Sequence, residues 1–320
     1  MTAKKLIAGL FAAMTAAGAF APAVVYAQQP GSYKDAISAY EKSDDKANYA
    51  MEIALDYKYG WAGAPRDGNK AIVWLDKAFD AGVVRAATIA GTMYMNGDGL
   101  KKDYSKAEKY YRKAASKGDE SAKIRLGQMY YYGNGVKVDY KSAAKWYASA
   151  AQEYENTNDC SKACVYLGEI YFYGWQEGKQ TVRDYVKSAM WLEKAFKAGH
   201  IESSDILAVI YSDDHKGIKQ NKVKARKFLL SGASKGYNLA IKALIEDYIY
   251  GKNGKADPVQ AYAWAAVLAD RDNSNAAQRV LDIAKDGLTS ANRAKAEKAA
   301  SDAVKKYHDV VYEIDTDNID

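Results

Sequence analysis

Residues 126–151, LGQMYYYGNGVKVDYKSAAKWYASAA, contain the pattern that decides the fold. Apolar residues recur at helical spacing up to three tyrosines, and Gly133 and Gly135 follow, as in a tight turn. Asp139 then precedes a second helical pattern. Aspartate is a favoured N-cap because its side-chain oxygen accepts hydrogen bonds from the backbone N–H groups of the first turn. The stretch therefore predicts two short helices joined by a glycine loop.

The same pattern occurs six times, with copies 36 to 41 residues apart. Each first helix has a marker tyrosine, preceded four and eight residues earlier by mostly small or apolar residues. This spacing indicates one buried stripe that includes the tyrosine. The markers are Tyr57, Tyr94, Tyr130, Tyr171, Tyr211 and Tyr248.

Each second helix begins after an Asp or Asn and has an aromatic residue seven positions beyond that residue. The predicted caps are Asp67, Asp103, Asp139, Asp184, Asn221 and Asp257. In four copies a glycine stands where the helix should end in a left-handed residue. These are Gly82, Gly118, Gly199 and Gly236.

A helix pair of this kind cannot bury its apolar stripes alone, so the copies are expected to stack. We predict an all-α fold, an α-solenoid superhelix of stacked helix-turn-helix repeats, with six repeats in residues 48–270. Residues 28–47, with a capping-box pattern opening at Ser32, are predicted to form an N-terminal capping half-repeat. Residues 271–312 should form C-terminal capping helices and residues 313–320 a flexible tail.

The repeated pattern has the form AxxxLGxxYxxGxGVxxDxxKAxxWYxxAAxxG, and a second close copy is AATIAGTMYMNGDGLKKDYSKAEKYYRKAASKG. On these residues, positions 32–308 resemble the Sel1-like repeat family, which is related to tetratricopeptide repeats. The resemblance implies a non-enzymatic adaptor or scaffold that binds a protein partner. It also includes a cysteine-rich branch linked to penicillin binding, but this chain has Cys164 at one of that branch's two cysteine positions and Ala151 at the other.

The N-terminus has the three-part pattern of a secretory signal peptide. Lys4 and Lys5 precede an apolar run over residues 6–21, and small residues lead to a predicted cleavage site after Ala27. We expect an exported bacterial protein, periplasmic or secreted, with an uncleaved membrane anchor as the alternative. Beyond residue 27 no apolar run approaches ~20 residues, so we expect no membrane insertion of the mature chain.

The charge of the chain does not indicate a nucleic-acid partner. The formal net charge is +6, removal of residues 1–27 would leave +4, and acidic and basic residues alternate along the remainder. Clustered basic residues, the usual sign of nucleic-acid binding, are not found.

The two cysteines, Cys160 and Cys164, are predicted to form a disulfide in an oxidising compartment. The prediction requires a non-helical Cys160, because two cysteines four residues apart within a regular helix would be strained.

No motif predicts a catalytic, metal or cofactor site. The glycine loops lie between two predicted helices with no preceding strand, which is not the context of a phosphate-binding loop. His200, His215 and His308 stand in different sequence contexts. No nucleophile, general base and orienting residue occur together at the spacing of a known catalytic motif. An alternative remains a cell-wall-directed enzyme or binder of β-lactam, peptidoglycan or exopolysaccharide, and Trp61 and Trp175 could stack on sugar rings.

The first helices also have a second stripe, whose residues vary from copy to copy. It consists of the positions nine, five and two residues before the marker tyrosine and the position two residues after it. This spacing places the stripe on one helical face, expected to be the concave side of the solenoid. Tyrosine and arginine, which commonly anchor protein interfaces, are frequent there. We predict that a monomeric chain binds its protein partner through this stripe, whereas the alternative is a solvated surface. The predicted residues are Arg85, Ile89, Arg125, Gln128, Tyr132, Lys162, Tyr166, Glu169 and Tyr173.

Overall fold

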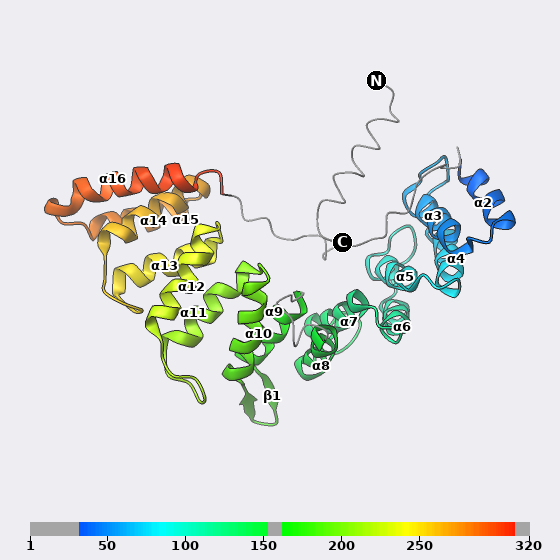
Figure 1. Cartoon of the computed structure of the whole chain (residues 1–320), viewed down its shortest axis with the longest axis horizontal. Coiled ribbons are helices and arrows are strands. Elements are labelled where there is room, and N and C mark those ends of the chain that lie inside the picture. The colour runs from blue at the N-terminus through cyan, green and yellow to red at the C-terminus, as the bar shows by residue number, and fades with distance from the viewer. Residues whose placement is uncertain (1–31, 153–161, 311–320) are drawn as a thin grey trace, which may run out of the picture. The chain divides into compact units, whose positions relative to one another are not determined.

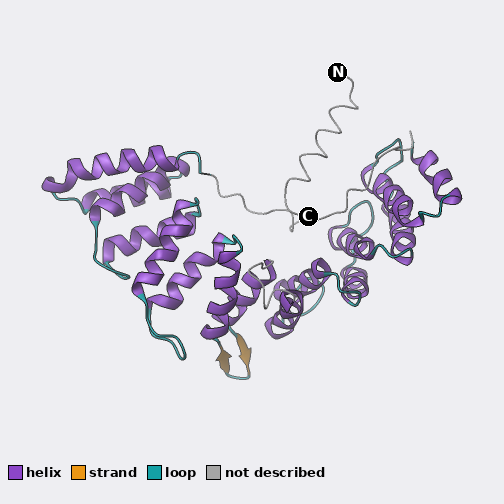
Figure 2. Cartoon of the chain, viewed as in Figure 1, coloured by secondary structure: helices purple, strands orange, loops and turns teal. Residues whose placement is uncertain are grey.

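The computed structural model describes residues 32–152 and 162–310. Within them the chain is built from consecutive α-helices, with one short β-hairpin and one 3-10 turn (Figures 1 and 2). It divides into two compact units, one ending at Val83 and the other beginning at Val84. The division falls between the first and second copies of the repeated pattern.

Each repeat has a first and a second helix. The first helices are α3 (Lys46–Tyr59), α5 (Val84–Asn96), α7 (Glu120–Tyr132), α9 (Lys162–Tyr173), α11 (Ser204–Ser212) and α13 (Asn238–Tyr250). The second helices are α4 (Gly68–Asp80), α6 (Tyr104–Ala115), α8 (Tyr140–Ala151), α10 (Tyr185–Lys197), α12 (Lys222–Ser234) and α14 (Pro258–Arg271). The other helices are α2 (Tyr33–Lys42), α15 (Asn275–Asp286), α16 (Ser290–Tyr307) and the 3-10 turn η2 (Ile201–Ser203).

The predicted helix boundaries are confirmed by local hydrogen bonds. All six predicted caps precede a second helix and accept a hydrogen bond from the backbone N–H three residues later, and Asp257 also accepts one from the N–H two residues later. The four predicted terminal glycines have φ between 84° and 105°, in the left-handed region that favours glycine. The repeat frame therefore follows from interactions within single turns.

The core consists of apolar stripes packed between consecutive helices. The residues four positions before each marker tyrosine are fully buried: Ile53, Ala90, Leu126, Leu167, Leu207 and Leu244. In the first unit α2 and α4 pack against α3, and in the second unit each helix from α5 to α14 packs against the next. After α14, both α15 and α16 pack against it. This arrangement is an α-solenoid, as predicted.

The marker tyrosines are less buried than the periodicity predicts. Tyr57 and Tyr248 are buried, but the other four are half-buried. Tyr130 shows the reason, since its hydroxyl accepts a hydrogen bond from Arg112 Nη2 at 2.9 Å and lies 3.4 Å from Glu108 Oε1. A phenolic hydroxyl requires polar partners, so these rings lie along the edge of the helix interface with the hydroxyl directed to charged side chains.

The inner loop of the fourth repeat is a β-hairpin, which the sequence analysis did not predict. Strands β1 (Trp175–Glu177) and β2 (Gln180–Val182) pair antiparallel around Gly178, which has φ 64°. Glu177 Oε1 lies 2.6 Å from Lys141 Nζ at the start of α8. Figure 2 shows this hairpin beyond the ends of its two helices.

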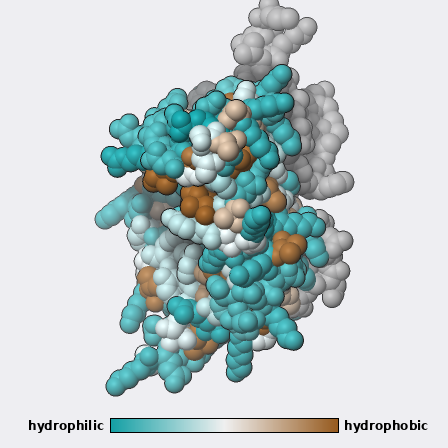
Figure 3. All heavy atoms as spheres, turned by 90° about the vertical axis from the view of Figure 1, so that its left-hand side faces the viewer, coloured by the Kyte–Doolittle hydropathy of each residue, from teal (hydrophilic) through white to brown (hydrophobic). Residues whose placement is uncertain are grey.

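None of the helices in the described ranges combines the length and apolar character needed to cross a membrane. The face drawn in Figure 3 is mostly hydrophilic, with small separate hydrophobic areas.

Candidate functional site

Five tyrosines from three successive helices gather in the second unit. Tyr131 and Tyr132 end α7, Tyr147 lies on α8, and Tyr166 and Tyr173 lie on α9. We call these five residues the tyrosine cluster. The Tyr147 and Tyr166 rings stack with centroids 4.9 Å apart, and the Tyr131 ring lies 4.9 Å from Tyr132 and 6.1 Å from Tyr166. Tyr132 and Tyr173 are more than half exposed, so the cluster has a solvent-facing side.

A helical glycine positions the buried member of the cluster. Tyr147 is fully buried, and its ring lies directly against Gly127 of α7. A Cβ at residue 127 would lie 2.6 Å from the Tyr147 ring, which is closer than atoms in contact can approach. The ring therefore occupies the space that the missing side chain leaves. The same arrangement occurs one repeat earlier, where Tyr111 packs on Gly91.

The two hydroxyls at these equivalent positions differ in their partners. The Tyr111 hydroxyl lies 3.2 Å from Thr92 Oγ1, with which it shares a hydrogen bond. The Tyr147 hydroxyl is buried and has no hydrogen-bond partner among the described residues. A buried polar group normally has a partner, so this hydroxyl is an exception that calls for an explanation.

Polar side chains connect the cluster across the repeats. Gln128 Nε2 donates to the Tyr166 hydroxyl and Arg125 Nη1 donates to Gln128 Oε1, each at a long 3.4 Å. Tyr166 also acts on the pKa of the Tyr132 hydroxyl. Side chains of α7 and α9 therefore meet directly, although α8 lies between these helices in the chain and packs on both.

Acidic side chains border the cluster on its α11 side. Burial raises the pKa of Glu169 to about 7, with further contributions from the charges of Asp205 and Glu202, while Lys162 acts in the opposite direction. Burial likewise raises the pKa of Asp205, and Glu202 adds to the effect. Two carboxylates of the fifth repeat thus lie within electrostatic reach of one from the fourth.

The hydroxyls of Tyr131, Tyr132, Tyr147 and Tyr173 stay protonated at neutral pH, because the pKa of each is raised. Burial raises the pKa of Tyr132 to about 12, followed by the effects of Tyr166 and Glu169. Burial also raises the pKa of Tyr131 and of Tyr147, and the charge of Glu169 contributes to both. The cluster therefore offers neutral rings and hydroxyls beside carboxylates.

The structure brings together most, but not all, of the predicted stripe. Residues of the third and fourth repeats form or border the tyrosine cluster: Arg125, Gln128, Tyr132, Lys162, Tyr166, Glu169 and Tyr173. Arg85 is exposed and Ile89 is half-buried on α5, and neither shares a hydrogen bond, ion pair or ring contact with the cluster among the described residues. These two side chains lie one repeat before α7 and two repeats before α9.

Four residues of the site were missed by the sequence analysis: Tyr131, Tyr147, Glu202 and Asp205. A signal existed for Glu202, which stands nine residues before the marker Tyr211, a stripe position that was applied only to earlier repeats. Asp205 is out of that register because η2 precedes α11 and changes the helical phase. Tyr147 looks like a core residue from sequence, and only its packing against Gly127 places it beneath the cluster.

The raised pKa of Glu169 predicts a pH-dependent effect of Glu169→Gln on stability. Below about pH 4.5 the carboxyl is protonated in both the folded and the unfolded chain. Between pH 4.5 and 7 the unfolded chain ionises the carboxyl while the folded chain keeps it protonated, so the stability contributed by the neutral carboxyl is lost across this interval. The neutral variant should therefore gain about 2–3 kcal/mol of unfolding free energy at pH 8 and almost none at pH 4 to 5.

Urea unfolding at both pH values measures this effect. Glu246→Gln, on the exposed surface of α13, is the matched control and should change stability little at either pH. Equal effects of Glu169→Gln at pH 5 and pH 8 would contradict the buried environment of Glu169.

The other predicted features lie elsewhere. Cys164 is fully buried in the first turn of α9 and is not a free thiol. Its predicted partner, Cys160, lies outside the described residues, so the bridge between them stays a prediction. Trp61 is 47% exposed and stacks on Tyr59, whereas Trp175 is half-buried in the hairpin and its Nε1 donates to Glu177.

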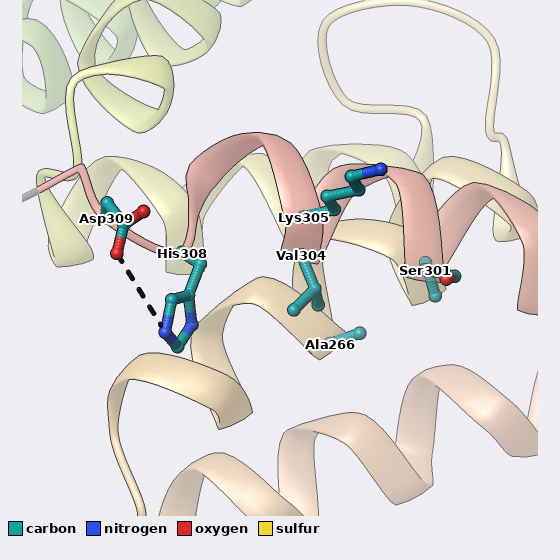
Figure 4. A pocket seen from close by; sticks show the side chains of 7 residues that line it. Ala266, Ser301, Val304, Lys305, His308 and Asp309 are labelled. Atoms are coloured by element: carbon teal, nitrogen blue, oxygen red, sulfur yellow. Dashed lines mark ion pairs between the residues drawn. The ribbon is translucent and has the colours of Figure 1, made fainter.

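A shallow pocket of about 610 Å³ lies beside α16. Figure 4 shows its lining residues, with His308 and Asp309 at one end and Ser301 at the other. His308 Nδ1 lies 2.8 Å from Asp270 Oδ2, and this contact raises the pKa of the imidazole. His308 is exposed and the lining is mostly small and aliphatic, so the pocket supplies no arrangement of nucleophile and base. No group of three or more His, Cys, Asp or Glu residues within 32–152 and 162–310 is placed to hold a metal ion.

The comparison with known proteins agrees with the repeated architecture. The Sel1 repeat model matches residues 47–83, 84–119, 121–154, 161–200, 206–237 and 237–273. The chain is similar to the crystal structure of a Sel1 repeat protein from Oxalobacter formigenes, with 27% identity and a TM-score of 0.52 over 80% of this chain and 95% of that one.

A second similar structure is that of c5321, described as a protective antigen of uropathogenic Escherichia coli strains with an SLR fold. It is 21% identical, with a TM-score of 0.47 over 86% of this chain and 72% of that chain. Among curated proteins, none matches significantly. Sel1 repeats generally mediate protein–protein interaction, and proteins of this kind are typically non-enzymatic scaffolds. With six matched repeats that cover most of its length, the chain belongs to the Sel1 repeat family.

Proposed function

We propose that the protein is an exported, non-enzymatic adaptor that binds a protein partner at the tyrosine cluster. The observation that carries this proposal is the set of exposed rings on a rigid base. Tyr132 and Tyr173 are 57% and 58% exposed, and Tyr166, beside them, stacks on the fully buried Tyr147. Large aromatic side chains held in place by packing are typical anchors of protein interfaces.

The proposed surface follows the first helices of the third to fifth repeats, which we expect to form the concave side of the solenoid. Arg125 and Gln128 lie at one edge of the cluster and Glu169 and Asp205 at the other. An interface with rings at the centre and polar groups at the rim excludes water from the rings when it is occupied. Export rests on the signal-peptide pattern of residues 1–27, which lie outside the described residues.

A paired-variant binding experiment tests the proposal. Partners are captured from envelope extract on the immobilised mature protein, identified by mass spectrometry, purified and measured by titration against the full mature chain. Tyr132→Ala combined with Tyr173→Ala should weaken binding about 10-fold or more, because truncating an interface anchor costs about 2 kcal/mol or more. Both side chains are exposed, so circular dichroism and the melting temperature should stay unchanged.

Met190→Ala combined with Val223→Ala is the matched control. These side chains are exposed on the second helices α10 and α12, away from the cluster. The control should bind like the wild type. Equal affinity of the tyrosine variant and the wild type for every captured protein would refute the proposed surface.

A further inference from the structure

Glu169 is a half-buried carboxyl group without a hydrogen-bond donor among the described residues. It lies in the middle of α9, and neither of its oxygens accepts a hydrogen bond from any residue in the described ranges. Its neighbours from the next repeat, Asp205 and Glu202, are also acidic. Lys162 is the cation whose charge acts on Glu169, but it stands two helical turns away, about 10 Å along the axis. Burying a carboxylate is costly unless a donor or a cation compensates it.

A second buried acceptor points toward the same place. The Tyr147 hydroxyl is fully buried and has no hydrogen-bond partner among the described residues. It lies within electrostatic reach of Glu169, Tyr132 and Tyr166. Two acceptors without donors therefore lie beside the exposed rings of the cluster. A ligand that supplies several N–H donors and a positive charge would compensate both.

The same solenoid holds its own cations in this way at two other places. Arg226 places its guanidinium 4.7 Å from the centre of the Tyr248 ring, and its Nε lies 2.5 Å from Asp247 Oδ2. Lys224 Nζ lies 3.9 Å from the centre of the Tyr211 ring and 2.6 Å from Glu193 Oε1. In both cases the cation joins a tyrosine face of a first helix to a carboxylate, a combination of cation–π attraction and ion pairing.

At the tyrosine cluster the rings and the carboxylate are present, but no described cation occupies the equivalent position between them. We propose that the partner segment bound at the tyrosine cluster presents a lysine or arginine side chain, which lies against Tyr132, Tyr166 or Tyr173 and forms an ion pair with Glu169. This inference rests on the proposed function and specifies the chemistry of the partner at that surface. Glu202 and Asp205 add negative charge on the side of α11 and favour a basic segment over a neutral one.

Binding of such a segment depends on pH in a defined direction. The groups that face Glu169 are Lys162 and Tyr173 on its own helix, Tyr131 and Tyr132 on α7, Tyr147 on α8, and Glu202 and Asp205 from η2 and α11. The pKa values of these four tyrosines are raised, so their hydroxyls stay neutral between pH 6 and pH 8, while Glu169 ionises in this interval. Affinity for the cation should therefore rise with pH across it.

Blocked peptides that differ only in the charge of two side chains provide the test. The probes are fluorescein-labelled twelve-residue Gly/Ser peptides with two central arginines, or with two citrullines, which have nearly the same shape without the charge. Fluorescence polarisation is measured on the full mature protein at pH 6 and pH 8. The arginine peptide should bind about 10-fold or more tightly than the citrulline peptide at pH 8 and lose part of this preference at pH 6.

Two variants assign the preference to the cluster. Glu169→Gln, which keeps the shape of the side chain and should fold at least as stably as the wild type, should reduce the arginine preference about 10-fold, whereas Glu246→Gln should leave it unchanged. Tyr147→Phe should weaken arginine binding at unchanged stability if its hydroxyl takes part. Equal binding of arginine and citrulline peptides, no binding of either, or a preference that persists in Glu169→Gln would each overturn the inference.

The outcome is separable from that of the proposed function. If Tyr132→Ala combined with Tyr173→Ala removes a captured partner while the arginine preference is absent, the surface binds protein by other chemistry and only the cationic ligand is wrong. If Glu169→Gln loses the captured partner as completely as the tyrosine variant does, and the neutral peptide does not bind in its place, the proposed surface and the cationic ligand are both supported.

Discussion

Arg226→Met should lower the free energy of unfolding of the second unit by about 3–5 kcal/mol, because it leaves a buried carboxylate without its cation. The Asp247 side chain is 2% exposed and that of Arg226 is 18% exposed, with Arg226 Nε 2.5 Å from Asp247 Oδ2. Arg226 Nη1 and Nη2 also donate to the Lys255 carbonyl, at 3.2 and 3.3 Å. One side chain thus ties α12 to α13 and to the loop that follows α13.

Urea unfolding monitored by far-UV circular dichroism measures the effect, with separate transitions fitted if the two units unfold independently. Lys227→Met, exposed one residue further along α12, is the matched control and should change stability by less than about 0.5 kcal/mol. Adding Asp247→Asn to Arg226→Met removes the uncompensated charge and should restore part of the loss. A loss below about 1 kcal/mol for Arg226→Met would show that the pair is solvated and not buried.

In the first unit, the aspartate at the repeat position of Asp247 has, among the described residues, no arginine of the kind that pairs with Asp247. Asp56, like Asp247, stands one residue before a marker tyrosine and is buried. Its Oδ2 has no hydrogen-bond partner among the described residues, and burial raises its pKa. Identical repeat positions therefore carry different electrostatic costs, according to what the neighbouring helix supplies.

Tyr147→Ala should lower the free energy of unfolding by about 3–5 kcal/mol, the usual cost of deleting a large buried aromatic side chain. The ring is fully buried between Gly127 and the stacked Tyr166, so its removal leaves a cavity at the junction of α7, α8 and α9. Tyr166 would lose the base on which it rests. The binding surface should therefore lose its order as well as its stability.

Tyr147→Phe is the control that separates the ring from its hydroxyl. The ring and its packing stay, and only a buried hydroxyl without a partner is removed. Stability should be unchanged or raised by about 1 kcal/mol, because leaving a buried polar group unsatisfied is unfavourable. Thermal and urea unfolding of both variants provide the measurement. A Tyr147→Phe variant as unstable as Tyr147→Ala would mean that the hydroxyl has a partner in solution.

The helical frame could be predicted from sequence because its signals are local. Asp139 and the other caps act on backbone groups two or three residues away, and glycines such as Gly118 adopt a left-handed conformation that other residues avoid. Six copies repeat these signals, so chance agreement is excluded. The hairpin of residues 175–182 lay outside this logic, since strand pairing is not part of the repeat pattern.

The candidate site was predictable in part. Helical spacing placed Arg125, Gln128 and Tyr132 on one face, and the structure joins them to α9. Spacing alone could not show that Arg85 and Ile89 lie apart from this group, because helical phase says nothing about which neighbouring side chains reach one another. Residues that are neighbours in the sequence pattern are therefore not always the residues whose side chains contact one another in the fold.

Sequence alone therefore determines the six helix pairs, their caps and the face on which variable side chains stand. The tertiary structure decides that the half-buried Glu169 lies near Asp205 with no hydrogen-bond donor among the described residues, while Asp247 has Arg226. Desolvation and Coulomb interactions depend on distances in space, and the groups that set them come from neighbouring repeats. Stacking of the repeats thus brings the carboxyl groups of Glu169, Glu202 and Asp205 near one another beside the tyrosine cluster.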